Sequence, residues 1–177
     1  YTPGSQVDSG GVLVDSLVPM SFSNLGVTGL LAVRNDPLGA GGRADTLVIY
    51  GAAEFDVFGV PGAGNVTQTN AAGVHVPVAT PGVSVLRLES LGGNDIFNVS
   101  GTLPYTTTHI HGGEGDDDDV LNLTAPASAV RVELGGPVIR GYSDDGNALT
   151  VDIIHHVGLQ TINVDAGQRQ AEFVGTG

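Results

Sequence analysis

The chain has 177 residues, of which 41% are hydrophobic, and this is enough apolar material for a folded domain with a substantial core. Nineteen acidic residues against six arginines, with no lysine, give a net charge of −13. A surface this acidic repels nucleic acid and anionic membranes and attracts divalent cations. The absence of lysine and cysteine excludes lysine-based catalysis, thiolate nucleophiles, disulfides and cysteine-ligated metals.

Short apolar runs of about five or six residues, rich in valine, isoleucine and threonine, alternate with glycine-rich stretches along the chain. Such runs indicate strands rather than helices, and none approaches the roughly 18 residues of a membrane span. Tight-hairpin signals are few, since Asp-Gly occurs once, at Asp145-Gly146, and Asn-Gly never. We therefore predict an all-β fold, an irregular parallel β-solenoid of short strands and glycine-rich turns. A β-sandwich of antiparallel strands is the alternative.

A pattern of apolar segment, glycine and second apolar segment occurs three times along the chain. Internal repetition of this kind is typical of arrays whose units stack to bury a shared core. We expect the three segments to superpose, with their glycines in equivalent turns. The segments are residues 18–33 around Gly26, 74–88 around Gly82 and 150–164 around Gly158.

The repeat predicts that the whole chain, residues 1–177, forms a single β array. It would contain the tail of a unit (1–17), two units (18–73 and 74–149) and a partial unit (150–177). The expected core residues, most of which alternate along the predicted strands, are Val18, Phe22, Leu30, Leu47, Ile49, Phe58, Val76, Val78, Leu86, Leu88, Phe97, Val99, Leu121, Leu123, Ile153, Ile162 and Val164.

Acidic residues cluster at the predicted strand entries, where a glycine-rich turn is followed by an aspartate, one residue and a large apolar residue. Along a strand, residues two apart point the same way, so the aspartate begins the strand and the apolar residue enters the core. The glycines permit a backbone on which carbonyl oxygens converge, and such oxygens beside a carboxylate suit calcium. The pairs are Asp45 with Leu47, Asp56 with Phe58, Asp95 with Phe97 and Asp119 with Leu121.

These turns resemble the hemolysin-type (RTX) calcium-binding repeats, whose pattern is G-G-x-G-x-D-x-U-x with U large and apolar. The resemblance is to the degenerate form found in very long secreted or surface proteins of bacteria such as planctomycetes, and it extends loosely over residues 18–167. The pattern is matched by Gly93, Asp95, Phe97, Gly112, Gly113 and Gly115.

The chain also departs from the RTX pattern. Glu54 and Arg43 stand where the third glycine is expected, and the acidic run 116–119 is two residues too long. The Asp-x-U pairs are separated by 11, 39 and 24 residues, which predicts at most one or two calcium sites. Ordinary Asx-type turns are the expectation for Asp45 and Asp56. The calcium ligands that the resemblance implies are Asp95, Gly113, Gly115, Asp116, Asp117 and Asp119.

Histidines and arginines supply the remaining candidate sites. His109 and His111 would share one face of a strand, which suits a transition metal if a further ligand lies near, although exposed strand positions are the expectation. Asp117 with either histidine offers an acid and a base, and a polysaccharide-active site would add Arg87 or Arg131 in a groove. No nucleophile elbow, zincin helix or phosphate loop occurs.

Three Asn-x-Ser/Thr tripeptides begin at Asn65, Asn98 and Asn122, and the last two directly follow the large apolar residue of the motif. We interpret them as solvent-facing polar positions on half-buried strands.

These features predict a non-enzymatic structural segment of a secreted or cell-surface bacterial protein, serving as a stalk, matrix component or filament subunit, with calcium as its candidate cofactor. The expected partners are copies of the chain or adjoining repeats, joined by pairing of end strands. The alternatives are a carbohydrate-binding or adhesive module, for which aromatic residues are scarce, and a polysaccharide-active β-helix enzyme.

Overall fold

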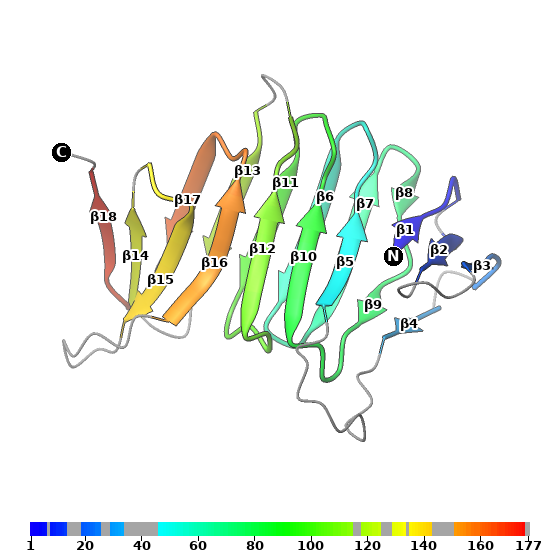
Figure 1. The fold of residues 1–177 in the computed structure, drawn as a ribbon, viewed down its shortest axis with the longest axis horizontal. Coiled ribbons are helices and arrows are strands. Elements are labelled where there is room, and N and C mark those ends of the chain that lie inside the picture. The colour runs from blue at the N-terminus through cyan, green and yellow to red at the C-terminus, as the bar shows by residue number, and fades with distance from the viewer. Residues whose placement is uncertain are drawn as a thin grey trace.

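The computed structural model describes residues 1–6, 8–13, 19–25, 29–33, 46–114, 118–124, 129–133, 135–142 and 151–175. In these residues all regular elements are β-strands, so the predicted all-β class is confirmed (Figure 1). Within the same ranges no helix is present that is long and apolar enough to cross a membrane. The strands are β1 (Thr2–Pro3), β2 (Gly10–Val12), β3 (Met20–Phe22), β4 (Leu31–Ala32), β5 (Thr46–Tyr50), β6 (Asp56–Pro61), β7 (Asn65–Asn70), β8 (Gly73–Val74), β9 (Val78–Ala79), β10 (Val85–Glu89), β11 (Ile96–Ser100), β12 (Thr107–His111), β13 (Val120–Thr124), β14 (Ala129–Glu133), β15 (Val138–Tyr142), β16 (Val151–Val157), β17 (Thr161–Asp165) and β18 (Ala171–Val174).

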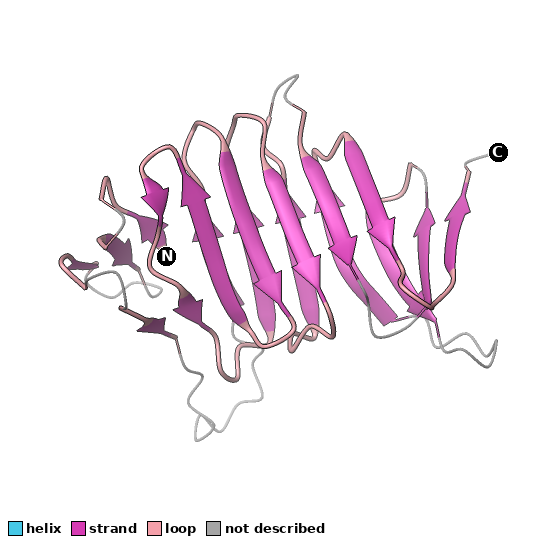
Figure 2. Cartoon of the chain, turned by 180° about the vertical axis from the view of Figure 1, so that it is seen from behind, coloured by secondary structure: helices cyan, strands magenta, loops and turns pink. Residues whose placement is uncertain are grey.

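Two large sheets lie face to face with the core between them, as the front and back views show (Figures 1 and 2). The seven-stranded sheet has the order β18-β14-β15-β16-β12-β10-β5. The eight-stranded sheet has the order β17-β13-β11-β6-β7-β9-β4, with β8 paired to β7. A small antiparallel sheet, β1-β2-β3, lies at the N-terminal end.

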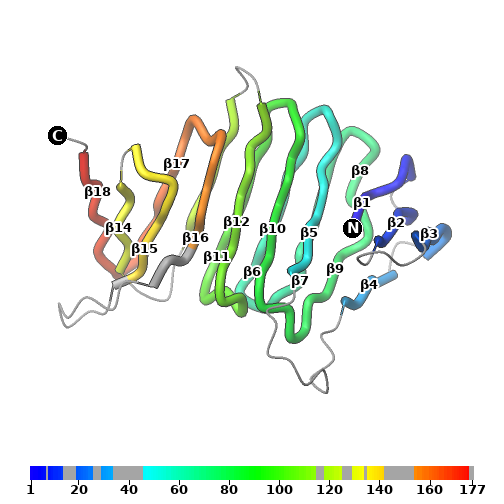
Figure 3. The backbone as a smooth tube through the Cα atoms, in the orientation of Figure 1, coloured from blue at the N-terminus to red at the C-terminus, as the bar shows by residue number. Residues whose placement is uncertain are grey.

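Four strand–turn–strand units, here called rungs, form the centre of the molecule: β5–β6, β10–β11, β12–β13 and β16–β17. In each rung the first strand belongs to the seven-stranded sheet and the second to the eight-stranded sheet, so the chain passes repeatedly from one layer to the other (Figure 3). Equivalent strands of successive rungs pair in parallel and in register. The register aligns Phe58, Phe97, Leu121 and Ile162 in one inward row.

Antiparallel strands interrupt this parallel arrangement at two places. After β6 the chain turns back through β7, and between the third and fourth rungs it inserts β14 and β15, which pair antiparallel with each other. Strand β15 also pairs antiparallel with β16, with a shift of register at Ile139/Arg140. The strand pairing is therefore mixed, neither purely parallel nor purely antiparallel.

The predicted equivalence of the three glycine turns is wrong for the two that the structure describes. Both glycines have the positive φ of a turn, 80° at Gly82 and 76° at Gly158. Gly82 leads from β9 of the eight-stranded sheet to β10 of the seven-stranded sheet, whereas Gly158 leads from β16 to β17 in the opposite direction. Apolar segments flank a glycine at both ends of a rung, so this pattern cannot distinguish the two ends. Gly26 lies outside the described residues.

The core matches the predicted residues with one clear exception. Leu30 is 56% exposed, because its neighbour Leu31 packs against the core instead. Phe58 and Phe97 are fully buried and stack with ring centroids 5.2 Å apart. Val18 and the side chain of Ile153 lie outside the described residues. Partly buried residues are Phe22, Ile162 and Val164, and the confirmed buried residues are Leu47, Ile49, Phe58, Val76, Val78, Leu86, Leu88, Phe97, Val99, Leu121 and Leu123.

Candidate functional site: a ladder of buried carboxylates

The turns that join the two strands of each rung stack closely on one another. Gly93 and Gly113 have φ of +98° and +96°, a region that L side chains rarely adopt. A Cβ at Gly93 would lie 2.6 Å from the carbonyl carbon of Glu54, and one at Gly113 would lie 2.4 Å from the carbonyl oxygen of Leu91. Glycine at these positions therefore lets the backbones of successive turns approach closely.

Stacking of the turns places Asp56, Asp95 and Asp119 in one column at the start of β6, β11 and β13. Because residues two apart share a strand face, each carboxylate points to the same side as the buried apolar residue that follows it. The three aspartates are 0%, 0% and 2% exposed, respectively. The carboxylates are thus part of the interior.

Each of these carboxylates is a hydrogen-bond acceptor for the neighbouring rung. The amide of Asp56 donates to Asp95 Oδ1 at 2.7 Å, and the amide of Asp95 donates to Asp119 Oδ1 at 2.8 Å. The amide of Asp119 donates to Gln160 Oε1 at 2.7 Å, so the fourth rung uses an uncharged amide in place of the carboxylate. We call Asp56, Asp95, Asp119 and Gln160 the carboxylate ladder. It links all four rungs through side-chain acceptors and backbone N–H donors.

Asp56 and its neighbour in the ladder, Asp95, differ in how their remaining oxygens are satisfied. Asp56 accepts from the amide of Ala52 at 2.6 Å and from Gln68 Nε2 at 2.8 Å. The bond from Ala52 is the local turn-capping that the sequence predicted for Asp56. Asp95 Oδ2, in contrast, is buried and has no hydrogen-bond partner of good geometry.

The position of Asp95 between two other carboxylates changes its acidity. Burial raises the pKa of Asp95 to about 7, and the neighbouring Asp119 and Asp56 carboxylates add to the increase. The Ser90 hydroxyl and the Asp56 amide act in the opposite direction by favouring the ionised form. Asp95 therefore holds a proton over a pH range in which an exposed aspartate is fully ionised.

Of the predicted calcium ligands, the structure describes Asp95, Gly113 and Asp119. Asp95 and Asp119 come together as predicted, but each directs Oδ1 to a backbone amide, and Gly113 packs against the turn of Leu91. In the part of the chain that the structure describes, no group of three or more histidine, aspartate or glutamate side chains could hold a metal ion. Predicted residues outside the described ranges are Asp45, Gly115, Asp116 and Asp117.

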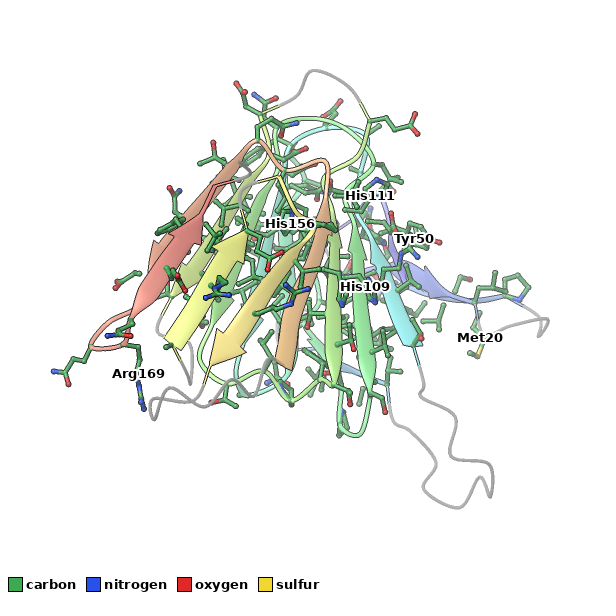
Figure 4. All side chains as sticks on the ribbon, turned by 60° about the vertical axis from the view of Figure 1, so that its left-hand side comes forward. Met20, Tyr50, His109, His111, His156 and Arg169 are labelled. Atoms are coloured by element: carbon green, nitrogen blue, oxygen red, sulfur yellow. The ribbon has the colours of Figure 1, made fainter. Side chains whose placement is uncertain are left out.

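A second polar cluster lies on the outward side of the seven-stranded sheet (Figure 4). His109 and His111 share this side, as predicted, but their rings have different partners. His109 stacks on His155 with ring centroids 5.0 Å apart, and His111 Nδ1 lies 2.7 Å from Glu89 Oε2. Burial lowers the pKa of His109, and His155 and Arg87 lower it further, while Glu89 opposes them.

The arginines of this side are paired with glutamates. Arg87 forms an ion pair with Glu89, close to the histidines. The other two pairs are Arg131 of β14 with Glu172 of β18, and Arg140 of β15 with Glu133 of β14. We call this outward side of the seven-stranded sheet the charged face. Because these three arginines have glutamate partners, they are not free cations poised for an anionic substrate.

The outward side of the eight-stranded sheet is different in character. Asn122 Nδ2 donates to Asn98 Oδ1, and Asn163 Nδ2 donates to Asn122 Oδ1, both at 2.9 Å. We call this row the asparagine ladder. Asn98 and Asn163 are exposed, which confirms the solvent-facing position predicted for Asn98.

Twelve outward positions on β6, β11, β13 and β17 make up the neutral face. They form three rows in strand register, and Asp165 is the single charged residue among them. The rows are Val57-Ile96-Val120-Thr161, Gly59-Asn98-Asn122-Asn163 and Pro61-Ser100-Thr124-Asp165.

Sequence reasoning missed both ladders as continuous features. It found the Asp-x-U motif at Asp56, Asp95 and Asp119, but not its fourth copy at Gln160, where the acid is replaced by an amide. A longer pattern of five successive residues could have revealed the fourth copy. Its positions are an acid or amide, any residue, an apolar residue, Asn or Gly, and a second apolar residue. That pattern begins at Asp56, Asp95, Asp119 and Gln160.

The chain was also compared with known proteins. No protein-family model, curated protein or solved structure matches it.

Proposed function

We propose that the chain is a non-enzymatic structural repeat segment of a secreted or cell-surface bacterial protein, acting as a stalk, matrix component or filament subunit. Its rungs would form an irregular parallel β-solenoid, extended by the antiparallel strands β7, β14 and β15. The observation that carries the proposal is the carboxylate ladder, which runs without a break through all four rungs. In this chain the recurring polar residues serve to join one rung to the next.

The polar chemistry of the chain favours this role over catalysis. The aspartates that recur in the motif are buried and accept backbone amides, so they are not available to a substrate. On the charged face, Glu89 is held by Arg87 and His111. A carbohydrate-binding module would in addition need aromatic platforms, and the stacked pair of Phe58 and Phe97 is buried in the core.

Pairing of end strands with copies of the chain or with adjoining repeats belongs to the same proposal. Strand β17 ends the eight-stranded order and β18 ends the seven-stranded order within the described residues. Phe173 of β18 is 52% exposed, although its register partner Val132 is buried. Ile162 and Val164 of β17 are only partly buried. A further strand placed against this end would cover these apolar side chains.

The mass and location of the natural polypeptide test this proposal. Antibodies raised against the folded chain should detect a protein far larger than 17.9 kDa, or an assembled filament, that surface-added protease removes from intact cells. Detection only inside the cells, as a monomer of this mass, would contradict the proposal.

A further inference from the structure

The two ends of the stack of rungs differ in what lies against them. At the first rung, the amide of Tyr50 in β5 donates to the carbonyl oxygen of Tyr1 at 3.0 Å, and the Tyr1 ring is 6% exposed and stacks on Phe22. The other strand of this rung, β6, pairs antiparallel with β7, from which Gln68 Nε2 donates to Asp56 Oδ1 at 2.8 Å. The first rung is therefore closed by other segments of the chain.

The fourth rung has no such cover on β17 within the described residues. Strand β17 pairs with β13 on one side and ends the eight-stranded order. The amide of Thr161 donates to the carbonyl oxygen of Asp119 in the third rung at 3.1 Å. Because alternate residues of a strand direct their backbone groups to the same side, the amides of Ile162 and Val164 point away from β13. This edge of β17 therefore presents backbone groups that a further strand can pair with.

The rows of inward side chains also lose their cover at this end. In the seven-stranded sheet, Ile139 and Val132 are 0% and 1% exposed, whereas the next member of their row, Phe173 of β18, is 52% exposed. In the eight-stranded sheet, Leu121 is 0% exposed, but its register partner Ile162 is only partly buried. A further strand beside β17 that carries apolar side chains on its inward face would extend the core at this end.

The preceding rungs show which kind of strand fits beside β17. Strands β6, β11, β13 and β17 pair in parallel and in register, and each has apolar residues at two inward positions on either side of an outward Asn or Gly. At that outward position, Asn122 Nδ2 donates to Asn98 Oδ1 and Asn163 Nδ2 donates to Asn122 Oδ1. Each asparagine thus donates to the preceding rung, so an asparagine of the next strand would donate to Oδ1 of Asn163.

We propose that the open edge of β17 is a strand-binding site that takes a parallel apolar-Asn-apolar strand from an adjoining repeat of the same polypeptide. The inference rests on the proposed structural function, and it gives the array one closed end and one open end. A second copy of this chain fits less well, because its first rung is closed and its end strands β17 and β18 lie at the same open end. Two β17 strands that pair about a two-fold axis with their inward faces on the same side run antiparallel, which does not continue the register of the rungs.

Hydrogen exchange of the chain, alone and with a synthetic peptide that copies residues 119–124, tests the proposal. The amides of Ile162 and Val164 should exchange fast in the chain alone, and millimolar peptide should slow them at least fivefold. A control peptide with Leu121→Asp and Leu123→Asp keeps the length but loses the inward apolar positions, so it should give no protection. The proposal is overturned if the first peptide gives no protection, if both peptides protect equally, or if both amides already exchange slowly without peptide.

A pair of protein variants tests the part that the asparagine ladder plays in recognition. Asn163→Ala removes the acceptor Oδ1 at an exposed position and should weaken binding of the peptide about threefold. Asn98→Ala is the matched control, since Asn98 is an exposed member of the same row but lies on β11, which is already paired on both sides. Equal binding by the two variants would overturn the recognition of asparagine that the proposal assigns.

The concentration dependence of the same exchange rates distinguishes the possible occupants. Protection of Ile162 and Val164 that increases with the concentration of the chain alone would identify a second copy as the occupant and would overturn the assignment to an adjoining repeat. A peptide that does not bind would remove the strand-binding site but not the structural function, which the mass and surface location of the natural polypeptide test separately.

Discussion

The two ladders lie on the same strands but differ in burial, and this decides what each contributes. Asp95 and Asn98 are three residues apart, and each links its rung to neighbouring rungs through side-chain hydrogen bonds. If the hydrogen bond at Asp95 is lost, a buried backbone amide is left without an acceptor. If the hydrogen bond at the exposed Asn98 is lost, water can take the place of the missing partner. A side-chain hydrogen bond between rungs therefore contributes much more to stability in the interior than at the surface.

The largest expected effect comes from removing the charge at Asp95. The pKa of Asp95 is raised to about 7 from 3.8, so the folded state holds its proton more tightly than the unfolded state. Its contribution to stability is complete below about pH 4 and is lost as the pH rises to about 7, by on the order of 4 kcal/mol. Asp95→Asn should lack this loss and be the more stable protein at pH 8.

Urea denaturation of both proteins between pH 4 and pH 8 measures this difference. Asp118→Asn, an exposed position in the following turn, is the charge-matched control and should follow the wild type. If Asp95→Asn and the wild type have parallel pH profiles, Asp95 is not the titrating group.

Next in size is the loss of one acceptor from the carboxylate ladder. Asp119→Ala removes the oxygen that accepts the amide of Asp95 at 2.8 Å. A buried amide is left without a partner, and the free energy of unfolding should fall by about 3 kcal/mol. Asp119→Asn keeps an oxygen acceptor, as Gln160 does in the fourth rung, and should lose clearly less in the same denaturation experiment. Equal losses would show that the carboxylate acts by its charge and not as an acceptor.

The stacked turns that align the carboxylates should be sensitive to a single methyl group. Gly113→Ala places a Cβ 2.4 Å from the carbonyl oxygen of Leu91 at a φ of +96°. The strain should lower the free energy of unfolding by about 2 kcal/mol. Gly175→Ala, where no atom lies within 4 Å of the added carbon, is the control and should leave the thermal midpoint unchanged. A silent Gly113→Ala would mean that the turns are not packed as closely as the structure shows.

The smallest effect is expected on the asparagine ladder. Asn122→Ala removes two exposed hydrogen bonds, one to Asn98 and one from Asn163, and should lower the free energy of unfolding by about 0.5 to 1 kcal/mol. Thr124→Ala on the same strand is the comparison for loss of an exposed side chain. An effect as large as that of Asp119→Ala would erase the distinction between the two ladders.

The sequence predicts the local pattern of this molecule better than its long-range order. Alternation correctly placed Phe97 and Val99 in the core and Asn98 on the outside, because the period of a strand is fixed by its backbone. It could not place Gly82 and Gly158 at opposite ends of a rung, since apolar residues flank both turns. The connection through β14 and β15 also separates the third and fourth rungs in the sequence, which hides their similarity.

For the candidate site, too, the sequence predicts the local pattern but not the contacts between rungs. The motif led to Asp95 and Asp119, and the rule that residues two apart share a face already implied that they point inward with Phe97 and Leu121. The calcium ligation that the resemblance implies for Asp95 and Asp119 also depends on residues 115–117, which lie outside the described residues. Which backbone amide donates to Asp95 or Asp119 depends on the neighbouring rung, 39 or 24 residues away in sequence, so no local pattern reveals it.

Amide hydrogen exchange in the presence of a calcium chelator tests the central claim most directly, namely that the buried carboxylates join the rungs by accepting the backbone amides of neighbouring rungs. The amides of Asp56, Asp95 and Asp119 should exchange as slowly as that of Phe97 within β11, because each donates to a side-chain oxygen of the next rung. Fast exchange of these three amides in the chelator, with protection only after calcium is added, would contradict the account.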